Sequence, residues 1–250
     1  MSYSYFADYY DGLTGDVDYP AKAEYFLELC RLFDHKPGLT VDLACGTGSF
    51  TLELKKRGID VIGADMSSDM LTQAQMKTSQ AGESITFIRC KMQDFVFPGK
   101  IDTCVCTLDS VNHITSKKEL EKAFCRINEC LSDDGLFIFD ANTVYKHREV
   151  LGDNCFIFDT PDVFCAWQNN YNEKNNRVII TLDFFEPRKG GYIRSSEQFS
   201  ERAYTHKEME LMLGNSGLEL VKIFDDMSFD EPKENSQREI YVVRKRKNEQ

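Results

Sequence analysis

Hydrophobic and polar positions along residues 20–142 follow two alternating patterns. Short, mostly apolar runs are typical of strands buried in a parallel sheet, and they occur at 40–44, 60–64, 85–90, 101–106 and 136–139. Between these runs, apolar residues recur three and four positions apart, as on the buried face of a helix, at 20–33, 49–57, 68–81 and 119–131. The alternation predicts an α/β fold with a doubly wound sheet.

The pattern changes after residue 143. Short strands separated by turn sequences at 172–176 and 189–191 are expected at 156–158, 163–171, 177–186 and 192–200. We expect a small antiparallel β lid, inserted after the fifth strand of the core. Its aromatic side chains are candidates for a pocket wall, although most are expected to form the core of the lid itself: Phe164, Trp167, Phe184, Phe185 and Tyr192.

The stretch 40–50, T-V-D-L-A-C-G-T-G-S-F, predicts a strand that breaks into a glycine-rich turn and then opens a helix. Glycine tolerates a positive φ and lets a ligand approach the backbone closely, and a helix start offers unpaired N–H groups. Asp65 follows Gly46 by 19 positions, at the end of the next apolar run, where an acid can accept hydrogen bonds from ribose hydroxyls. Together these features predict a nucleotide-like cofactor.

A dinucleotide-binding dehydrogenase is one alternative. Its G-x-G-x-x-G fingerprint requires a third glycine, and this chain has Thr51 there. A dehydrogenase of this kind would bind NADH tightly. The missing third glycine argues against this alternative.

The segment V-D-L-A-C-G-T-G resembles motif I of the class I S-adenosylmethionine-dependent methyltransferases, and G-A-D-M-S-S-D-M-L at 63–71 resembles the segment that follows it. Ser67 and Thr205 are expected to cap helices that run through 81 and 215. The resemblance implies a Rossmann-like seven-stranded sheet, with 218–224 and 239–243 as its closing antiparallel pair. It divides the chain into an N-terminal helical cap (1–36), a core (37–142 and 205–250) and the β lid (143–204).

The same resemblance implies that S-adenosylmethionine is the cofactor. The expected cofactor-binding residues are Tyr19, Ala44, Gly46, Gly48, Asp65, Met66, Gln93, Asp94 and Leu108. Within the family, Asp94 would accept a hydrogen bond from the adenine amino group, and Tyr19 would face the methionine end. Tyr10, in the segment F-A-D-Y-Y-D-G-L, would face the substrate.

Asp109 and His113 lie on the loop after the fourth core strand. Ligands of open α/β sheets bind outside the carboxyl ends of the strands, so both residues are expected to face the substrate. A hydrogen-bonded structural role for His113 stays open. Residues 201–204 resemble an H-x-x-R-x-Y element of the family, but Phe199 occupies the histidine position. Arg202 is then an anion clamp or a simple salt-bridge residue, and no catalytic base is assigned.

Charge and composition limit the classes of partner that we expect for this chain. The formal net charge of −11 opposes binding to a phosphate backbone, which needs many cationic side chains. No apolar run reaches the ~20 residues that cross a membrane, and the N-terminus lacks a signal pattern. Nine cysteines without a C-x-x-C pair are typical of reduced thiols rather than a metal site. We therefore expect a cytoplasmic protein without a bound metal.

The sequence thus predicts a methyltransferase that moves a methyl group to nitrogen or oxygen of a small-molecule acceptor. An RNA or protein methyltransferase and a non-catalytic S-adenosylmethionine-binding protein are the alternatives. The oligomeric state, monomer or homodimer, stays open.

Overall fold

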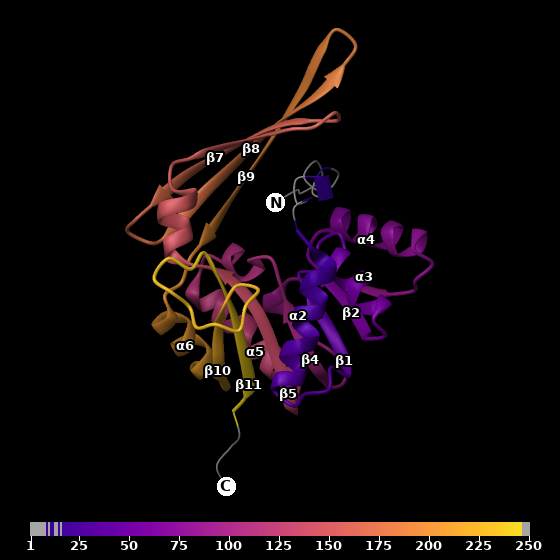
Figure 1. Ribbon diagram of the computed structural model, residues 1–250, viewed down its shortest axis with the longest axis vertical. Helices are drawn as coiled ribbons and strands as arrows, with labels where there is room; N and C mark the ends of the chain where they lie inside the picture. Colours follow the sequence, from indigo (N-terminus) through magenta and orange to yellow (C-terminus); the bar gives the residue numbers. More distant parts are fainter. Residues whose placement is uncertain (1–8, 10, 13–14, 16, 247–250) are drawn as a thin grey trace.

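The computed structural model describes residues 9, 11–12, 15 and 17–246 (Figure 1). Seven strands form one sheet in the order β10-β11-β5-β4-β1-β2-β3. They are β1 (Leu39–Leu43), β2 (Asp60–Asp65), β3 (Thr86–Arg89), β4 (Ile101–Cys106), β5 (Leu131–Asn142), β10 (Leu218–Asp225) and β11 (Arg238–Lys245). All neighbouring strands are parallel except β11, which is antiparallel to both β5 and β10. The predicted doubly wound, Rossmann-like sheet is confirmed.

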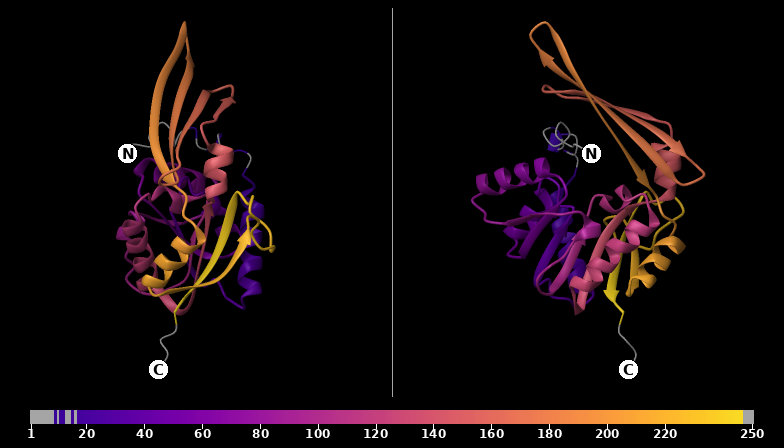
Figure 2. Two further views of the ribbon diagram at one scale, coloured as in Figure 1. Left: turned by 90° about the vertical axis from the view of Figure 1, so that its left-hand side faces the viewer. Right: turned by 180° about the vertical axis from the view of Figure 1, so that it is seen from behind.

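Helices cover both faces of this sheet (Figure 2). Apolar side chains of α2 (Tyr19–Leu32) and α3 (Ser49–Lys56) share one buried cluster with the sheet, and those of α5 (Lys117–Cys130) and α6 (His206–Asn215) share another. Helix α4 (Ser68–Gln80) lies beside β2 and β3. None of the helices within the described residues is long and apolar enough to span a membrane.

Local sequence explains where several helices begin. Side-chain oxygens of Ser67 and Ser116 accept hydrogen bonds from the first turns of α4 and α5. At α6, Thr205 and Glu208 cap each other's backbone N–H groups. Such caps each contribute roughly 1 kcal/mol by satisfying N–H groups that have no partner inside the helix. The predicted caps at Ser67 and Thr205 are therefore confirmed.

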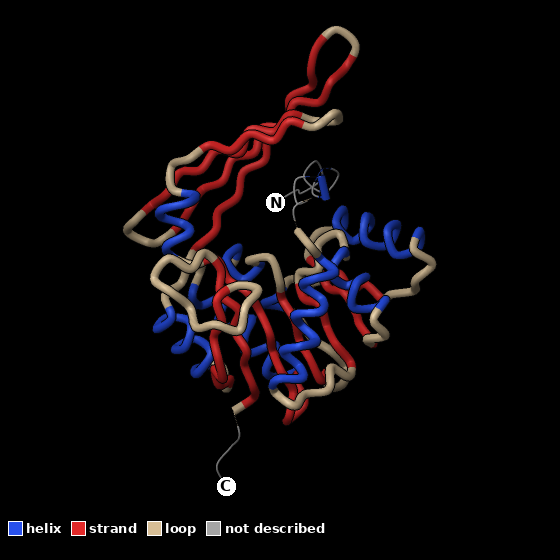
Figure 3. The backbone as a smooth tube through the Cα atoms, in the orientation of Figure 1, coloured by secondary structure: helices blue, strands red, loops and turns tan. Residues whose placement is uncertain are grey.

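The second sheet has four antiparallel strands in the order β6-β7-β8-β9 (Figure 3). They are β6 (Cys155–Asp159), β7 (Phe164–Asn172), β8 (Arg177–Arg188) and β9 (Gly191–Arg202). This sheet, called the lid below, has its own apolar core, in which Phe184 is fully buried, whereas Tyr192 is 69% exposed. The predicted antiparallel sheet is present, and the domain boundaries at 36, 142 and 204 remain predictions.

Two features differ from the expected pattern. Strand β5 begins at Leu131 rather than at 136. The residues around Gly135 do not interrupt the strand, because the pairing of β5 with β4 is irregular there. Between β5 and the lid lies an unpredicted π-helical segment, η3 (Lys146–Leu151). It carries Lys146 and His147 to the edge of the sheet at which β5 ends, and the lid rises from the same edge (Figure 1).

Candidate active site

The glycine turn after β1 has the backbone conformation that its sequence predicts. Ala44, Gly46 and Gly48 have φ values of 61°, 53° and 72°, in the left-handed region. A Cβ atom on Gly48 would lie 2.9 Å from Cβ of Ala74 in α4, whereas a Cβ atom on Gly46 would meet nothing within 4 Å. Gly48 therefore allows α4 to pack closely, and Gly46 leaves an open face of the backbone that a ligand can approach.

Asp65 stands at the end of β2, beside this turn. Its two carboxylate oxygens accept hydrogen bonds from the backbone N–H groups of Gly46 (3.0 Å) and Ser67 (2.8 Å). Burial raises the pKa of Asp65. Each oxygen has more than one acceptor position, so the oriented carboxylate retains capacity for ribose hydroxyls. The open face at Gly46 and this carboxylate fit the nucleoside end of S-adenosylmethionine.

The sequence did not reveal the contact between two further polar residues beside the turn, Asp42 and Thr51. Asp42 in β1 is buried and accepts a hydrogen bond from the Thr51 hydroxyl at 2.5 Å. Burial raises the pKa of Asp42 to about 7. Its place inside motif I was a signal for a role, but only the structure shows that no described residue forms an ion pair with it.

A polar link joins the N-terminal segment to the turn. Asp11 accepts a hydrogen bond from the Thr47 hydroxyl at 2.7 Å and forms an ion pair with Lys77 of α4 at 2.6 Å. Lys77 also donates to Ser49 Oγ (2.5 Å) and to Thr47 Oγ1 (3.0 Å). Tyr19 lines a hollow beside this link, together with Ser49 and Lys77.

The other expected cofactor residues surround the same strand ends. Met66 is 41% exposed just after β2. Gln93 and Asp94 lie on the short helix η1 (Met92–Asp94), and the Asp94 carboxylate accepts a hydrogen bond from Lys122 at 2.8 Å, which lowers its pKa. Leu108 follows β4. The contacts of all these residues with the cofactor remain predictions, and Tyr10 lies outside the described residues.

The loop after β4 is held by a carboxylate at the end of β5. Leu108 and Asp109 both adopt left-handed conformations (φ 56° and 53°). Asp140 accepts hydrogen bonds from their backbone N–H groups at 2.8 and 2.5 Å. Arg238 of β11 donates to Asp140 at 3.0 Å and to Asp109 at 2.6 Å. These hydrogen bonds and ion pairs join five groups, from the loop after β4, from β5 and from β11, into one network.

These contacts define the state of Asp109. Burial alone would raise the pKa of Asp109, but the charge and hydrogen bond of Arg238, together with the charges of Lys146 and His113, outweigh burial and lower the pKa to about 2. Asn142 donates a further hydrogen bond to Asp109 at 2.8 Å. A carboxylate this acidic does not take up a proton near neutral pH, so the geometry supports a structural role for Asp109 rather than a general base.

Two buried asparagines connect this loop with the lid. Asn112 and Asn142 exchange hydrogen bonds of 2.9 and 3.1 Å through side chain and backbone, and Asn112 Nδ2 also donates to the carbonyl oxygen of Arg202 at 2.9 Å. Lys146 donates to Asn142 Oδ1 at 2.9 Å, and burial lowers the pKa of Lys146.

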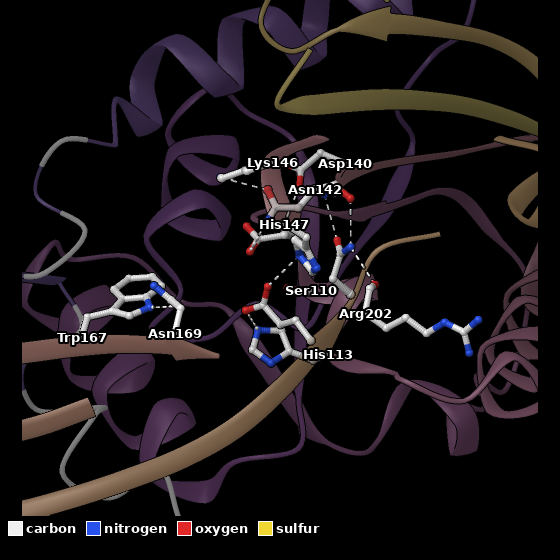
Figure 4. Close-up of polar contacts among 12 residues, drawn as sticks. Ser110, His113, Asp140, Asn142, Lys146, His147, Trp167, Asn169 and Arg202 are labelled. Atoms are coloured by element: carbon white, nitrogen blue, oxygen red, sulfur yellow. Dashed lines mark hydrogen bonds and ion pairs between the residues drawn. The ribbon is translucent and has the colours of Figure 1, made fainter. Parts of the chain in front are cut away.

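His113 and His147 face the same carboxylate, that of Glu201 in lid strand β9 (Figure 4). The distance from Glu201 to Nε2 is 3.6 Å for His113 and 3.5 Å for His147. The side chain of His113 is 35% exposed, those of Glu201 and His147 are 5% and 0% exposed. The sequence predicted His113 and missed the other two.

Arg202 does not join this group. In Figure 4 its guanidinium points away from His113 and His147. It donates to the carbonyl oxygen of Thr115 at 3.4 Å, forms an ion pair with Glu208 at 3.4 Å and lies over the ring of Tyr204. Of the two roles open for Arg202, these contacts favour the salt-bridge residue.

Comparisons with known proteins agree with this geometry. The profile of the family described as "Methyltransferase domain" matches residues 40–135. YqeM of Bacillus subtilis (strain 168), which carries the name of a methyltransferase, is 30% identical over 99% of this chain and 98% of its own length. The crystal structure of an S-adenosylmethionine-dependent methyltransferase from Clostridium acetobutylicum ATCC 824 has a TM-score of 0.88 and 30% identity, and covers 98% of this chain and 99% of that one.

A more distant structure shares the fold. The sugar N-methyltransferase KedS8 from Streptoalloteichus sp. ATCC 53650 is 18% identical, with a TM-score of 0.77 over 95% of this chain and 93% of that one. The full-length similarity at 30% identity, the glycine turn with Asp65 and the seven-stranded sheet lead to one conclusion. This chain belongs to the S-adenosylmethionine-dependent methyltransferases, and S-adenosylmethionine is its cofactor.

Proposed function

We propose that this enzyme methylates a nitrogen or oxygen atom of a small molecule, and that an amine nitrogen is the preferred acceptor. The proposal rests on one observation: the imidazole of His113, on the loop after β4, faces the carboxylate of Glu201 in the lid. The lid thereby supplies a carboxylate to an imidazole at the sheet edge where ligands of α/β folds bind.

Charge favours an amine. The leading charge effects on the pKa of Lys146 come from three carboxylates, Asp109, Asp140 and Glu201, and one cation, Arg238. Together with Lys146 itself, these groups sum to one negative charge when all are ionised. A cationic ammonium group is attracted to such a region, whereas a phosphate or carboxylate is repelled.

The names of relatives point the same way. The glycine/sarcosine N-methyltransferase of Parasynechococcus marenigrum (strain WH8102) is 27% identical over 54% of this chain. A dTDP-amino-sugar N,N-dimethyltransferase of Streptomyces venezuelae is 30% identical over 54% of this chain. Both names describe methyl transfer to nitrogen of a small molecule, and both proteins match through about half of their own length.

The reaction needs alignment and a proton acceptor. When bound, S-adenosylmethionine supplies a methyl group on a positively charged sulfur, which leaves as a neutral thioether. An acceptor that binds as an ammonium has no free lone pair, so it would have to give up one proton to a base of the protein before its nitrogen could attack the methyl carbon. The electron pair of the breaking S–C bond stays on sulfur. We propose that His113 takes the proton that the nitrogen loses. Alignment is worth about 7–11 kcal/mol of the barrier, and a positioned base adds about 10²–10⁴-fold.

The test is to incubate the protein with methyl-labelled S-adenosylmethionine and a size-fractionated cytosolic extract. We expect label in the small-molecule fraction, bound by a cation exchanger as an amine would be. Label confined to RNA or protein would replace the proposal with a macromolecular acceptor. Binding of S-adenosylhomocysteine with no label in any fraction would favour a non-catalytic binding protein. The Gly46→Ala variant, whose added Cβ atom would narrow the open face of the turn, serves as the control with slower transfer at a low concentration of S-adenosylmethionine.

A further inference from the structure

Glu201 has an unusual place in the fold. It lies in lid strand β9, and its carboxylate faces one imidazole from η2 (Ser110–His113) and another from η3. Its oxygen Oε1 is 3.6 Å from Nε2 of His113, and Oε2 is 3.5 Å from Nε2 of His147. Three segments that are distant in the sequence therefore meet at one buried carboxylate.

His147 faces an acceptor on each side of its ring. Nδ1 of His147 lies 3.4 Å from the carbonyl oxygen of Asn176, and Nε2 faces Oε2 of Glu201 at 3.5 Å. Neither Nε2 nor Oε2 has a hydrogen-bond partner, although both atoms are buried. A neutral imidazole has a single N–H, so it can serve one of these acceptors, whereas a ring with an N–H on both nitrogens would face both.

The contact with His113 determines which ring nitrogen is basic. A carboxylate facing Nε2 favours the tautomer with its proton on Nε2, and Nδ1 then carries the lone pair that accepts a proton. The same carboxylate stabilises the imidazolium that forms, as the aspartate of a serine-protease triad does for its histidine. Phe199, two residues from Glu201 on β9, lies against the His113 ring with centroids 5.2 Å apart. The lid strand thus fixes the ring by both charge and packing.

We propose that Glu201 is a positioning residue that sets the tautomer of His113 and couples it to His147. The proton that the acceptor nitrogen loses enters at Nδ1 of His113, while Nε2 of His113 faces one oxygen of Glu201 and Nε2 of His147 faces the other. No oxidant or reductant is involved. The base role of His113 rests on the proposed function, whereas the link between Glu201 and the two rings rests on geometry alone.

Other charged groups also act on these rings and are part of the design of the test. His113 interacts by charge with Asp65 of β2 and with Asp109 of the loop after β4. Glu201 interacts by charge with Lys146 of η3. A variant must therefore remove the Glu201 charge while it leaves these three groups in place, and Glu201→Gln does this with almost no change of shape.

The experiment is an NMR titration of the histidine Cε1–H signals. The chain has four histidines, so each signal is assignable from single His→Asn variants. In Glu201→Gln we expect the titration midpoints of His113 and His147 to fall by at least about 0.5 pH unit, since a facing carboxylate favours the charged ring. Glu201→Asp, which keeps the charge, should retain midpoints closer to those of the unmodified protein.

Glu239→Gln is the matched control. Glu239 pairs with His206 at 2.7 Å, so this variant should move the His206 signal and leave His113 and His147 unchanged. Unchanged midpoints of His113 in Glu201→Gln, with His206 responding in the control, would overturn the proposal. Both Glu201 variants should bind S-adenosylhomocysteine within about twofold of the unmodified protein, which shows that the fold is retained.

A transfer assay separates this proposal from the proposed function. With label transfer to the small-molecule fraction as the readout, we expect Glu201→Gln to slow transfer at saturating cofactor by about 10–100-fold, part of the range for a positioned base, and Glu201→Asp to recover part of it. Midpoint shifts without any loss of transfer would overturn the positioning role of Glu201. Transfer by His113→Asn then tests the base role of His113 separately, because that variant removes the ring itself.

Discussion

The two halves of the site are built in different ways, although they share one edge of the same sheet. The cofactor half, at the ends of β1 and β2, consists of contacts among residues 42–67, several of them made by backbone N–H groups. The acceptor half, at the ends of β4 and β5 and the base of the lid, consists of charged side chains; Asp109 and Arg238 alone are 129 positions apart. The half assigned to the cofactor is therefore built mainly from one local segment, whereas the half assigned to the acceptor is assembled from distant segments.

Buried aspartates show the contrast most clearly. Asp42, in the cofactor half, has no cationic partner among the described residues, and burial raises its pKa to about 7. Asp109, in the acceptor half, is paired with Arg238, and its pKa is lowered to about 2. Near pH 7 the same side chain is therefore only partly ionised in one half and fully ionised in the other, because only the acceptor half supplies a compensating cation.

The largest expected effect comes from removing that cation. Arg238→Met leaves Asp109 and Asp140 as unpaired buried carboxylates, and breaking a buried pair in this way costs about 3–5 kcal/mol. We expect a loss of that size in the free energy of urea unfolding. Arg31→Met, at an exposed position of α2, should change it by no more than about 0.5 kcal/mol. A loss below about 1 kcal/mol for Arg238→Met would mean that the acceptor half does not depend on its ion pairs.

The next effect concerns pH and the cofactor half. Between the unfolded pKa of an aspartate, about 3.9, and the folded value of about 7 for Asp42, the folded state binds more protons. Stability contributed by this group therefore falls as the pH rises through that window, by up to about 4 kcal/mol. Asp42→Asn should remove this contribution, so its stability relative to the unmodified protein should increase from pH 4.5 to pH 8.

Urea unfolding of the apo protein at several pH values measures this difference. Asp60→Asn, at the exposed first residue of β2, is the control and should give a difference that does not vary with pH. A pH-independent difference for Asp42→Asn would show that this carboxyl titrates as it does in the unfolded chain.

A smaller effect tests the open face of the glycine turn. Gly46 and Gly58 both have a positive φ (53° and 79°), and a Cβ atom on either would meet nothing within 4 Å. Gly46→Ala and Gly58→Ala should therefore cost similar stability, about 1 kcal/mol each. Only Gly46→Ala should weaken the binding of S-adenosylhomocysteine in a calorimetric titration, by about 10–100-fold. Equal affinities for the two variants would place the cofactor elsewhere.

The smallest effect concerns the link from Asp11 to the turn. Lys77 is 25% exposed, and such pairs contribute about 0–1 kcal/mol. Lys77→Met should therefore weaken S-adenosylhomocysteine binding by about two- to fivefold, if the N-terminal segment helps to cover the cofactor. Lys56→Met removes a comparable ion pair with Glu53 and should leave affinity unchanged. An equal loss of affinity in both variants would mean that the change in net charge, and not the contact between Asp11 and Lys77, weakens binding.

What the sequence predicted follows the same division. Element order, β4, the caps at Ser67 and Thr205 and the turn with Asp65 all follow from patterns within about 20 residues, where spacing and local hydrogen bonding determine structure. Arg238 and His147 were missed because nothing nearby in the sequence marks them. Glu201 lies in the segment recognised at 201–204, but its role depends on partners that only the fold brings to it. Asp109 was singled out by its position on the loop, but its partner Arg238 was not visible.

The most direct test of the proposed base role of His113 is label transfer by His113→Asn at saturating S-adenosylmethionine. The affinity for S-adenosylhomocysteine is measured on the same preparation. The account predicts affinity within about twofold of the unmodified protein and transfer to the small-molecule fraction slowed by at least about 10²-fold, the lower limit for loss of a general base. Transfer at the unmodified rate would contradict the role of His113, and loss of cofactor affinity would contradict the separation of the two halves.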